Sequence, residues 1–437
     1  MHSEISSERR KANVKRDLLR RAQEDGVRFV RLVFADVLGV SKTVCIPARR
    51  LEDALEHRIT FDGGSIDGFV RGEELDMVLC PDPATYALYP WSVEGGLEAR
   101  LLCDVAMPDA TPFEGCPRTT LRRAIERSRD ALPGLRIGAE VEFYLFEERR
   151  TSAFGSTQTH DVGSYFDFPA GDRGEEARSA IVAAVERMGI AVAGAHHEHG
   201  AGQHEIDLLP TDPLTAADAI LTVRTVAKHV AARFGLEATF MPKPLEDRAG
   251  SGLHVELRID DDDITPYAVG GLLAHARALT AVCNPTVNSY KRLVAAWDAP
   301  IHAVWSDRSA NALVRVPPHA TPPRIELRSP DPTCNPYLAL AVILGAATDG
   351  IVTRTVPGEP LAGSAYEVDE HEIRERGIGS LPKSLREAIA ELDGDPVVRA
   401  ALGDHLYHAF RDAKIAEYER YRSAVHPWEH RAYLRLY

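Results

Sequence analysis

Three features are missing from this 437-residue sequence, and each absence excludes a class of protein. The six cysteines are scattered and form no C-x-x-C pair, which indicates reduced cytosolic thiols rather than a disulfide framework. The polar N-terminal stretch MHSEISSERRKANVKRD is not a secretory signal peptide. The longest apolar run, residues 337–347, is too short to span a bilayer and predicts a buried helix. We therefore expect a cytoplasmic protein without a membrane span.

An excess of positive charge is also missing. Lysine and arginine number 51 against 65 aspartates and glutamates, so the net charge at pH 7 is −14. Proteins that bind nucleic acid or anionic membranes normally carry a basic balance, and we expect neither as a partner. An acidic balance remains compatible with metal binding, which uses carboxylates.

Common nucleotide and zinc motifs are absent too. No Walker A sequence occurs, and the glycine-rich AGSGLH (residues 249–254) is a weak signal that is more often a turn. The segment HHEHGAGQHE (residues 196–205) is dense in His and Glu, but it lacks H-E-x-x-H spacing and a nearby cysteine. Metal ligands and structural histidines are equally compatible with this segment.

A chain of 48.0 kDa can bury a large core without disulfides and suggests two or three domains. The first hundred or so residues predict a small α+β domain. Its expected helix covers residues 13–25, and its expected strands lie within residues 27–39, 44–47, 77–79 and 101–105. Turn residues crowd positions 107–117 and mark a boundary. We expect domains over residues 1–107 and 108–437.

Helical and strand patterns alternate in the second domain, which extends the α+β prediction to the whole chain. The expected helices span residues 121–131, 175–188, 215–234, 264–279, 385–392 and 406–423. The expected strands span residues 137–146, 205–209, 253–259, 313–317 and 324–329.

Several expected strands carry charged residues on one face, because residues i and i+2 of a strand point the same way. Glu140 and Glu142 lie side by side, with Val141 behind them. The other charged faces are His254 with Glu256 and Arg258, Arg324 with Glu326 and Arg328, and Glu205 with Asp207. Any one such face is usually the solvated side of an antiparallel sheet.

Four such strands in one domain point instead to a charged site. Neighbouring carboxylates repel each other, and a cation offsets that repulsion. Oxygen ligands suit Mg²⁺ or Mn²⁺, and a mixed histidine and carboxylate set suits Mn²⁺ in particular. Interleaved arginines bind phosphate bidentately. Metal, arginine and carboxylate together are the groups that phosphoryl transfer from a nucleotide requires.

The same segments, in this order, resemble the glutamine synthetase family over nearly the whole chain. The matching segments are FDGGSIDGF, DMVLCPDPATYALYPW, GAEVEFYLF, GSYFD, HHEHGAGQHEID, TFMPKP, GSGLH, NPTVNSYKRL, RIELRSPDP, NPYLA and HPWEHRAYL. The resemblance implies an N-terminal β-grasp domain and a catalytic domain built on an antiparallel sheet with flanking helices. It also implies active sites between neighbouring subunits of a ring, and we expect a homododecamer of two stacked hexamers.

The resemblance implies ATP as a substrate and two metal ions per site, Mg²⁺ or Mn²⁺. The other substrates would be glutamate and either ammonia or an amine. In the family, ATP phosphorylates the γ-carboxylate of glutamate, because a free carboxylate is a poor electrophile, and the amine then displaces the phosphate. The metals offset the charges of phosphate and carboxylate as these groups meet.

The resemblance assigns a role to each matched position. The ligands of the first metal correspond to Glu142, Glu198 and Glu205, and those of the second to Glu140, His254 and Glu326. The substrate contacts correspond to Arg292 at the α-carboxylate, Gly250 against the substrate backbone, and Arg328 as the catalytic arginine near the γ-carboxylate. The nucleotide-phosphate contacts correspond to Arg315 and Arg324.

The family's anionic ammonium pocket corresponds to Asp62, Ser65, Tyr165 and Glu198. Its flap glutamate corresponds to Asp298 in WDAP, which is one methylene shorter. The shorter acid weakens closure or leaves room for a larger amine. Asp62 favours ammonia, because ligases for larger amines often lose this pocket.

Positions around the nucleotide and the substrate depart from the family pattern. The departures are Ala193, Ala249, Glu256, Arg258 and Ala310, with Arg308 two residues from Ala310 as a substitute phosphate contact. Intact metal positions beside altered surroundings suggest a paralogue with a changed substrate more than an inactive enzyme. Tyr366 lies near a position that some family members adenylylate, and we interpret it as an ordinary loop tyrosine.

Three functions remain open on these grounds. The first is an ATP-dependent ligase that makes glutamine from glutamate and ammonia. The second is a γ-glutamyl ligase for a polyamine, an ethanolamine-like compound or another small amine. The third, from a different class, is a non-catalytic ring that senses glutamine or nucleotide.

Overall fold

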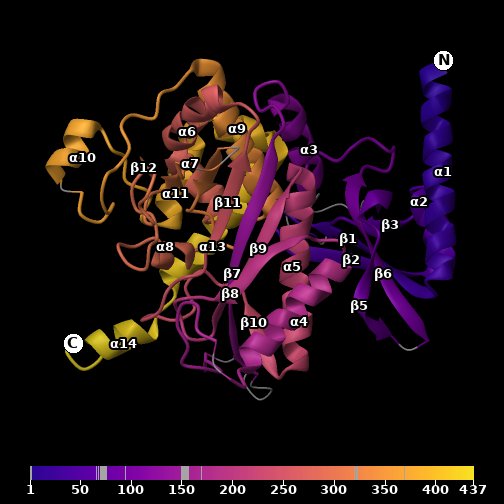
Figure 1. Ribbon diagram of the computed structural model, residues 1–437, viewed down its shortest axis with the longest axis horizontal. Helices are drawn as coiled ribbons and strands as arrows, with labels where there is room; N and C mark the ends of the chain where they lie inside the picture. The colour runs from indigo at the N-terminus through magenta and orange to yellow at the C-terminus, as the bar shows by residue number, and fades with distance from the viewer. Residues whose placement is uncertain are drawn as a thin grey trace.

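Two β-sheets organise the chain, and helices pack against both (Figure 1). The structure is a computed structural model that describes residues 2–64, 66, 68, 76–93, 95–148, 157–168, 170–318, 320, 323–368 and 370–437. One sheet belongs to the N-terminal quarter of the chain and the other to the remainder. This arrangement confirms the predicted α+β class.

The N-terminal sheet has the strand order β2-β1-β6-β4-β3, and β5 also pairs with β6. Its strands are β1 (Val27–Ala35), β2 (Ser41–Pro47), β3 (Thr60–Asp62), β4 (Asp76–Pro81), β5 (Ala87–Val93) and β6 (Gly96–Ala106). β1 and β6 run parallel, and the other pairs are antiparallel. Because side chains alternate along a strand, Val30 and Leu32 of β1 point to the same side, where they pack in a core with α1 (His2–Glu24) and α2 (Leu51–Leu55).

The second sheet has the order β12-β13-β14-β11-β7-β9-β8, and β10 also pairs with β7. Its strands are β7 (Arg136–Glu147), β8 (Val192–His197), β9 (Gln203–Thr211), β10 (Leu236–Thr239), β11 (Leu253–Arg258), β12 (Trp305–Ser306), β13 (Val314–Arg315) and β14 (Arg324–Leu327). All pairs are antiparallel except the short parallel contact between β12 and β13. Chain segments far apart in sequence therefore meet at the centre of this sheet.

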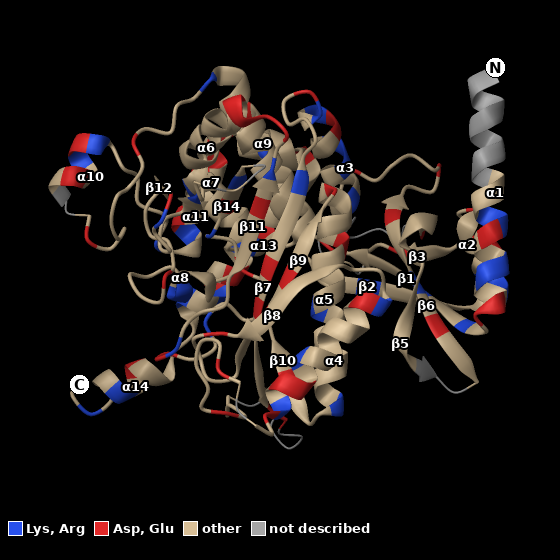
Figure 2. Cartoon of the chain, in the orientation of Figure 1, with Lys and Arg blue, Asp and Glu red and all other residues tan. Residues whose placement is uncertain are grey.

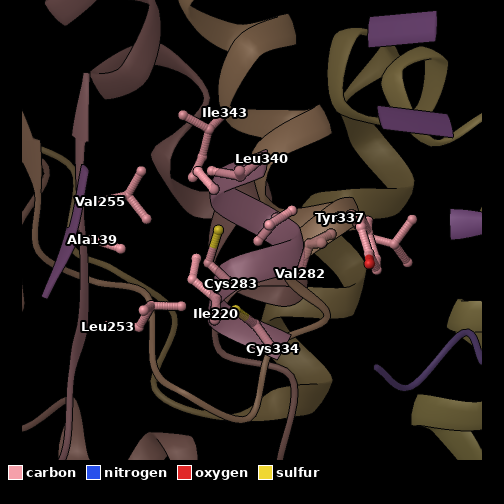
Figure 3. Close-up of a cluster of buried hydrophobic side chains, with 14 of the residues drawn as sticks. Ala139, Ile220, Leu253, Val255, Val282, Cys283, Cys334, Tyr337, Leu340 and Ile343 are labelled. Atoms are coloured by element: carbon pink, nitrogen blue, oxygen red, sulfur yellow. The ribbon is translucent and has the colours of Figure 1, made fainter. Parts of the chain in front are cut away.

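Helices cover the apolar face of the second sheet and continue into the C-terminal part of the chain (Figure 1). They are α3 (Pro117–Ser128), α4 (Arg173–Arg187), α5 (Pro213–Arg233), α6 (Thr265–Ala274), α7 (Ala276–Cys283), α8 (Ser289–Arg292), α9 (Pro336–Thr353), α10 (Glu370–Arg376), α11 (Leu385–Gly394), α12 (Pro396–Leu402), α13 (Asp404–Ser423) and α14 (Pro427–Tyr433). Figure 3 shows Leu253 and Val255 of β11 facing Ile220 of α5, Cys283 of α7 and Leu340 of α9.

Helix α9 lies at the centre of this core. Among the described residues it is the one helix long and apolar enough to span a membrane, but 67% of it is buried inside the protein. Ile343 and Leu344 are completely inaccessible to solvent. The sequence prediction of a buried helix at this position is therefore confirmed.

One expected helix is divided in two. Residues 264–279 read as a single helical pattern, whereas α6 ends at Ala274 and α7 begins at Ala276. The backbone of His275 leaves helical geometry between them, at φ −97° and ψ 5°. Its ring bonds to Asp395 through Nδ1 at 2.7 Å and to Asp349 through Nε2 at 3.1 Å. These tertiary bonds fix the break, and sequence periodicity does not report them.

Candidate active site

A polar cavity of about 320 Å³ opens above the centre of the second sheet. Figure 2 shows the acidic residues that gather on β7, β9 and β11 there. The apolar side chains of these strands enter the core on the opposite face, so alternation leaves the charged side chains toward the cavity. The lining residues predicted from sequence are Glu140, Glu142, Tyr165, Glu198, Glu205, Gly250, His254, Arg292, Asp298, Arg315 and Arg328.

Glu140, His254 and Glu326 form one compact group of ligand atoms. Strand register places His254 opposite Glu140, and Glu326 comes from β14 on the other side of β11. Nδ1 of His254 lies 2.8 Å from Oε2 of Glu140 and 3.8 Å from Oε1 of Glu326. One ligand atom from each residue lies within 4.8 Å of the others. Two carboxylates and one imidazole at this spacing fit a divalent cation such as Mg²⁺ or Mn²⁺.

Glu142, Glu198 and Glu205 form a second acidic group beside the first. Glu142 faces Glu205 across the β7–β9 pair, and Glu198 follows the end of β8. Oε2 of Glu142 accepts hydrogen bonds from the Gly252 N–H at 2.9 Å and the Gln203 side chain at 3.0 Å. These donors fix the orientation of the Glu142 side chain within the cavity.

Glu205 also forms a group of ligand atoms with His196 and Asp207, all within 4.8 Å of one another, and burial disfavours the charge of this region. Burial, followed by the nearby charge of Glu142, raises the pKa of Glu198 to about 8. The same two causes raise the pKa of Glu205 well above its usual value. Buried carboxylates that disfavour their own ionisation gain the most from a bound cation. The three glutamates, which offer only oxygen, again fit Mg²⁺ or Mn²⁺.

Arginines surround the first ligand group. Nη1 of Arg328 hydrogen-bonds Oε1 of Glu326, and Nη1 of Arg315 lies 3.5 Å from Oε2 of the same carboxylate. Arg324 is 3.9 Å from Glu326 but does not line the cavity. Burial disfavours ionisation of Glu140, but the hydrogen bond from His254 and the charges of His254 and the nearby arginines together lower its pKa to about 2. Cationic donors and ionised carboxylates therefore meet at one end of the cavity.

Arg292 forms a second cationic wall. Its guanidinium is buried and donates to the carbonyl oxygens of Ser329 at 2.7 Å and Arg328 at 3.0 Å. Gly250 packs directly against it, because a Cβ on Gly250 would meet Cγ of Arg292 at 2.7 Å. The carbonyl of neighbouring Ala249 accepts a hydrogen bond from Tyr144 at 2.7 Å. The glycine is thus required where the chain passes the arginine.

Asp298 lies at the cavity mouth in a short flap. Trp297 and Asp298 both adopt left-handed backbone conformations, with φ of 56° and 57°. The hydroxyl of Tyr366 lies 3.1 Å from the carbonyl oxygen of Ala296 and 2.9 Å from that of Ala299. Tyr366 therefore holds the two ends of this turn, a contact that its interpretation as an ordinary loop tyrosine did not include.

Sequence reasoning assigned no individual role to several cavity residues, although three of them lie in the His- and Glu-rich segment 196–205. His196, His199, Gln203 and Trp297 line the cavity, and the ring of Tyr165 stacks on His199 with 4.6 Å between centroids. His196 is flanked by Glu198 and Glu205, at 3.7 Å and 3.6 Å. The alternation of β8 would have placed His196 on the face of Glu198, but β8 was not expected as a strand.

Other predicted residues lie away from the cavity. Asp62 ends β3 on the N-terminal sheet, where its carboxylate accepts the Gly64 N–H at 2.8 Å. Arg308 is 82% exposed beside Asp307. Ala310 lines the cavity, but Arg308 does not take its place there. Ser65 falls outside the described residues.

Comparison with known proteins agrees with this geometry. The family model described as the glutamine synthetase catalytic domain matches residues 114–433, and the model described as the glutamine synthetase β-grasp domain matches residues 26–108. The chain belongs to the glutamine synthetase family. This membership confirms the resemblance inferred from the sequence motifs.

Full-length relatives support the same assignment. A glutamine synthetase of Methanosarcina mazei is 42% identical over 445 residues, covering 98% of this chain and 99% of the relative. One from Thermus thermophilus is 44% identical over 443 residues, covering 97% and 99%. Among solved structures, a GmaS/ADP complex has a TM-score of 0.85 at 31% identity and covers 95% of this chain and 99% of its own.

Proposed function

We propose that the protein is an ATP-dependent ligase that joins the γ-carboxylate of glutamate to ammonia and so makes glutamine. One observation carries the proposal: the cavity of about 320 Å³ is lined by Glu142, Glu198 and Glu205 and by arginines, the Glu140, His254 and Glu326 ligand group borders it, and the chain is 42–44% identical to glutamine synthetases. That combination suits transfer of a phosphoryl group between two anions.

In this proposal each wall of the cavity has its own task. Arg292 binds the α-carboxylate of glutamate, and Arg328 neutralises the γ-carboxylate and the arriving phosphoryl group. Arg315 contacts the phosphates of ATP from the cavity wall, and Arg324 and Arg308, which lie outside the cavity lining, are the further candidates. Mg²⁺ or Mn²⁺ bound by the two acidic groups would offset the negative charge of the phosphates.

The chemistry runs in two steps. The γ-carboxylate oxygen takes the terminal phosphoryl group of ATP and releases ADP. The amine nitrogen then bonds to the acyl carbon, the C–O bond to phosphate breaks, and the ammonium proton passes to a carboxylate of the acceptor pocket. We assign that pocket to Asp62, Ser65, Tyr165 and Glu198, closed by Asp298.

Assembly into a ring is part of the proposal. Asp62 lies on the N-terminal sheet and does not line the cavity of its own chain, so a neighbouring subunit would have to supply it. We propose a homododecamer of two stacked hexamers in the cytoplasm, with the domain boundary between residues 107 and 108.

A γ-glutamyl ligase for an organic amine is the second candidate. The short acid Asp298 at the cavity mouth favours it. Identity of 42–44% to glutamine synthetases over nearly the whole chain supports ammonia as the first candidate.

Phosphate release with ATP, Mg²⁺ and glutamate, measured against ammonia and a panel of small amines, tests both candidates. Release that depends on ammonia and disappears in Glu326→Ala supports the proposal. An amine far ahead of ammonia would select the second candidate. ADP formation that depends on metal but is not increased by ammonia or by any amine would contradict both candidate functions. No turnover under any condition would favour the non-catalytic sensing ring.

A further inference from the structure

A second cavity of about 430 Å³ lies between the N-terminal sheet and the helices of the second sheet. Its walls come from β5 and β6, from α3, from the turn between α4 and β8, and from the start of α5. It shares no lining residue with the candidate active site. Its four arginines are Arg21, Arg100, Arg118 and Arg187.

Arg100 is the unusual member of this set. It lies within β6, next to Ala87 of β5 and Arg31 of β1, and is 6% exposed. Its Nε and Nη1 atoms are buried and have no hydrogen-bond partner within the described parts of the chain. The charge of Asp218 acts on Arg100, but two buried guanidinium donors without a hydrogen-bond acceptor are still costly, so this group is expected to meet an anion.

Arg118 of α3 shows how a buried arginine is otherwise stabilised here. Its guanidinium donates to Asp218 at 3.0 and 2.8 Å and to Asp82 at 2.9 Å. Asp218 also accepts the hydroxyl proton of Tyr337 at 2.7 Å. The two aspartates that line the cavity are therefore already engaged, and neither hydrogen-bonds Arg100.

The lining of this cavity carries a net positive charge, because it contains four arginines and two aspartates. Arg118 and its aspartates form a closed network, which leaves Arg100 in the wall. Arg187 and Arg21 are exposed at the rim, and Arg21 lies 3.8 Å from Asp25. Arg21 lies over the ring of Tyr86, 4.9 Å from its centroid. An anion that approaches past the rim arginines would be attracted toward Arg100.

We propose that this cavity binds a small dianion whose oxygens pair with Arg100. A phosphate group and a short dicarboxylate share the required chemistry, because both present oxygens in a geometry that matches the guanidinium fork. Bound there, the anion would join the N-terminal sheet to α4 and α5 and raise the thermal stability of the protein.

Titration calorimetry of the full-length protein with phosphate and, separately, with succinate tests the proposal at constant ionic strength, with chloride as the control anion. The proposed active site also binds phosphate and carboxylates, so substitutions of arginines in the second cavity are needed to show where the anion binds. We expect Arg100→Gln to weaken binding at least about tenfold. Arg187→Gln, a change at the exposed rim, should weaken it without affecting folding. Arg28→Gln, an exposed arginine on β1 outside the cavity, should bind as the wild type does.

Crystals soaked with selenate give a direct second readout, since the anomalous signal of selenium should lie beside Arg100. Phosphate binding alone or succinate binding alone would identify the chemical source of the anion. Anion binding that is equal in the wild type, Arg100→Gln and Arg187→Gln would overturn the proposal. The absence of saturable binding of either anion would also overturn the proposal and would indicate that only water fills the cavity.

Discussion

Removing one hydroxyl from Tyr366 should impair closure of the proposed acceptor site. The single hydroxyl proton is shared between the carbonyl oxygens of Ala296 and Ala299, which frame the turn that carries Asp298. In Tyr366→Phe the ring remains, while the polar contact to both ends of the turn disappears. The same contact means that adenylylation of Tyr366 would have to detach the flap.

The expected magnitude follows from the backbone. Two consecutive non-glycine residues in left-handed conformations cost roughly 1–2 kcal/mol each. A neutral hydrogen bond contributes about 0.5–1.5 kcal/mol and therefore offsets a substantial part of this strain. Its loss should lower the ratio of ordered to disordered flap by about 2- to 13-fold. We expect kcat/KM for the nitrogen acceptor to fall by the same factor.

Steady-state kinetics with ammonia as the varied substrate would measure this effect. Tyr407→Phe is a matched control, because it also removes a tyrosine hydroxyl bond, to Asp393 at 2.9 Å, but outside the cavity. An unchanged kcat/KM in Tyr366→Phe would refute the flap-anchor reasoning, as would an equal decrease in Tyr407→Phe.

Three further outcomes follow from the electrostatics. Since the pKa of Glu198 is raised to about 8, binding of Mg²⁺ at pH 7 should release protons. Calorimetry of Mg²⁺ binding in buffers of different ionisation enthalpy measures this release, and a binding enthalpy that does not depend on the buffer would contradict the prediction. Hydrogen bonds to Asp395 and Asp349 raise the pKa of His275, so its stabilisation is complete below the unfolded pKa near 6.5 and is lost as pH rises through the folded value. The Tm deficit of His275→Gln should therefore be larger at pH 6 than at pH 9, and equal deficits would contradict the assignment. Arg292→Ala should raise KM for glutamate at least about tenfold, and an unchanged KM would displace the α-carboxylate from this residue.

The main elements of the fold were predictable because their patterns are local. The strand around Glu140 alternates apolar and charged residues, and the run at 337–347 is continuously apolar; both became the expected elements. The exceptions depend on distant contacts. His275 breaks a helical pattern through Asp349 and Asp395, and β8 is composed largely of small and polar residues that carry little strand signal.

The candidate site was predictable to the extent that its residues lie on strands. Glu140, Glu142, His254 and Glu326 follow from two-residue alternation, and register then brings them together. Periodicity alone could not show which face of the sheet is enclosed, or that Gln203 orients Glu142. These features depend on loops and on contacts between strands distant in sequence.

The identity of residue 298 illustrates how backbone geometry and substrate choice can be separated. At φ 57°, aspartate is better tolerated than glutamate, because its short side chain bonds local backbone in left-handed conformations. Aspartate at this position is then explained by the turn and does not require a larger amine. Asp298→Glu should lower kcat while leaving the ratio of kcat/KM for methylamine and ammonia within about twofold, since uniform flap strain affects both acceptors alike. A selective loss of methylamine activity would show that the missing methylene makes room for the acceptor and would favour the organic-amine ligase.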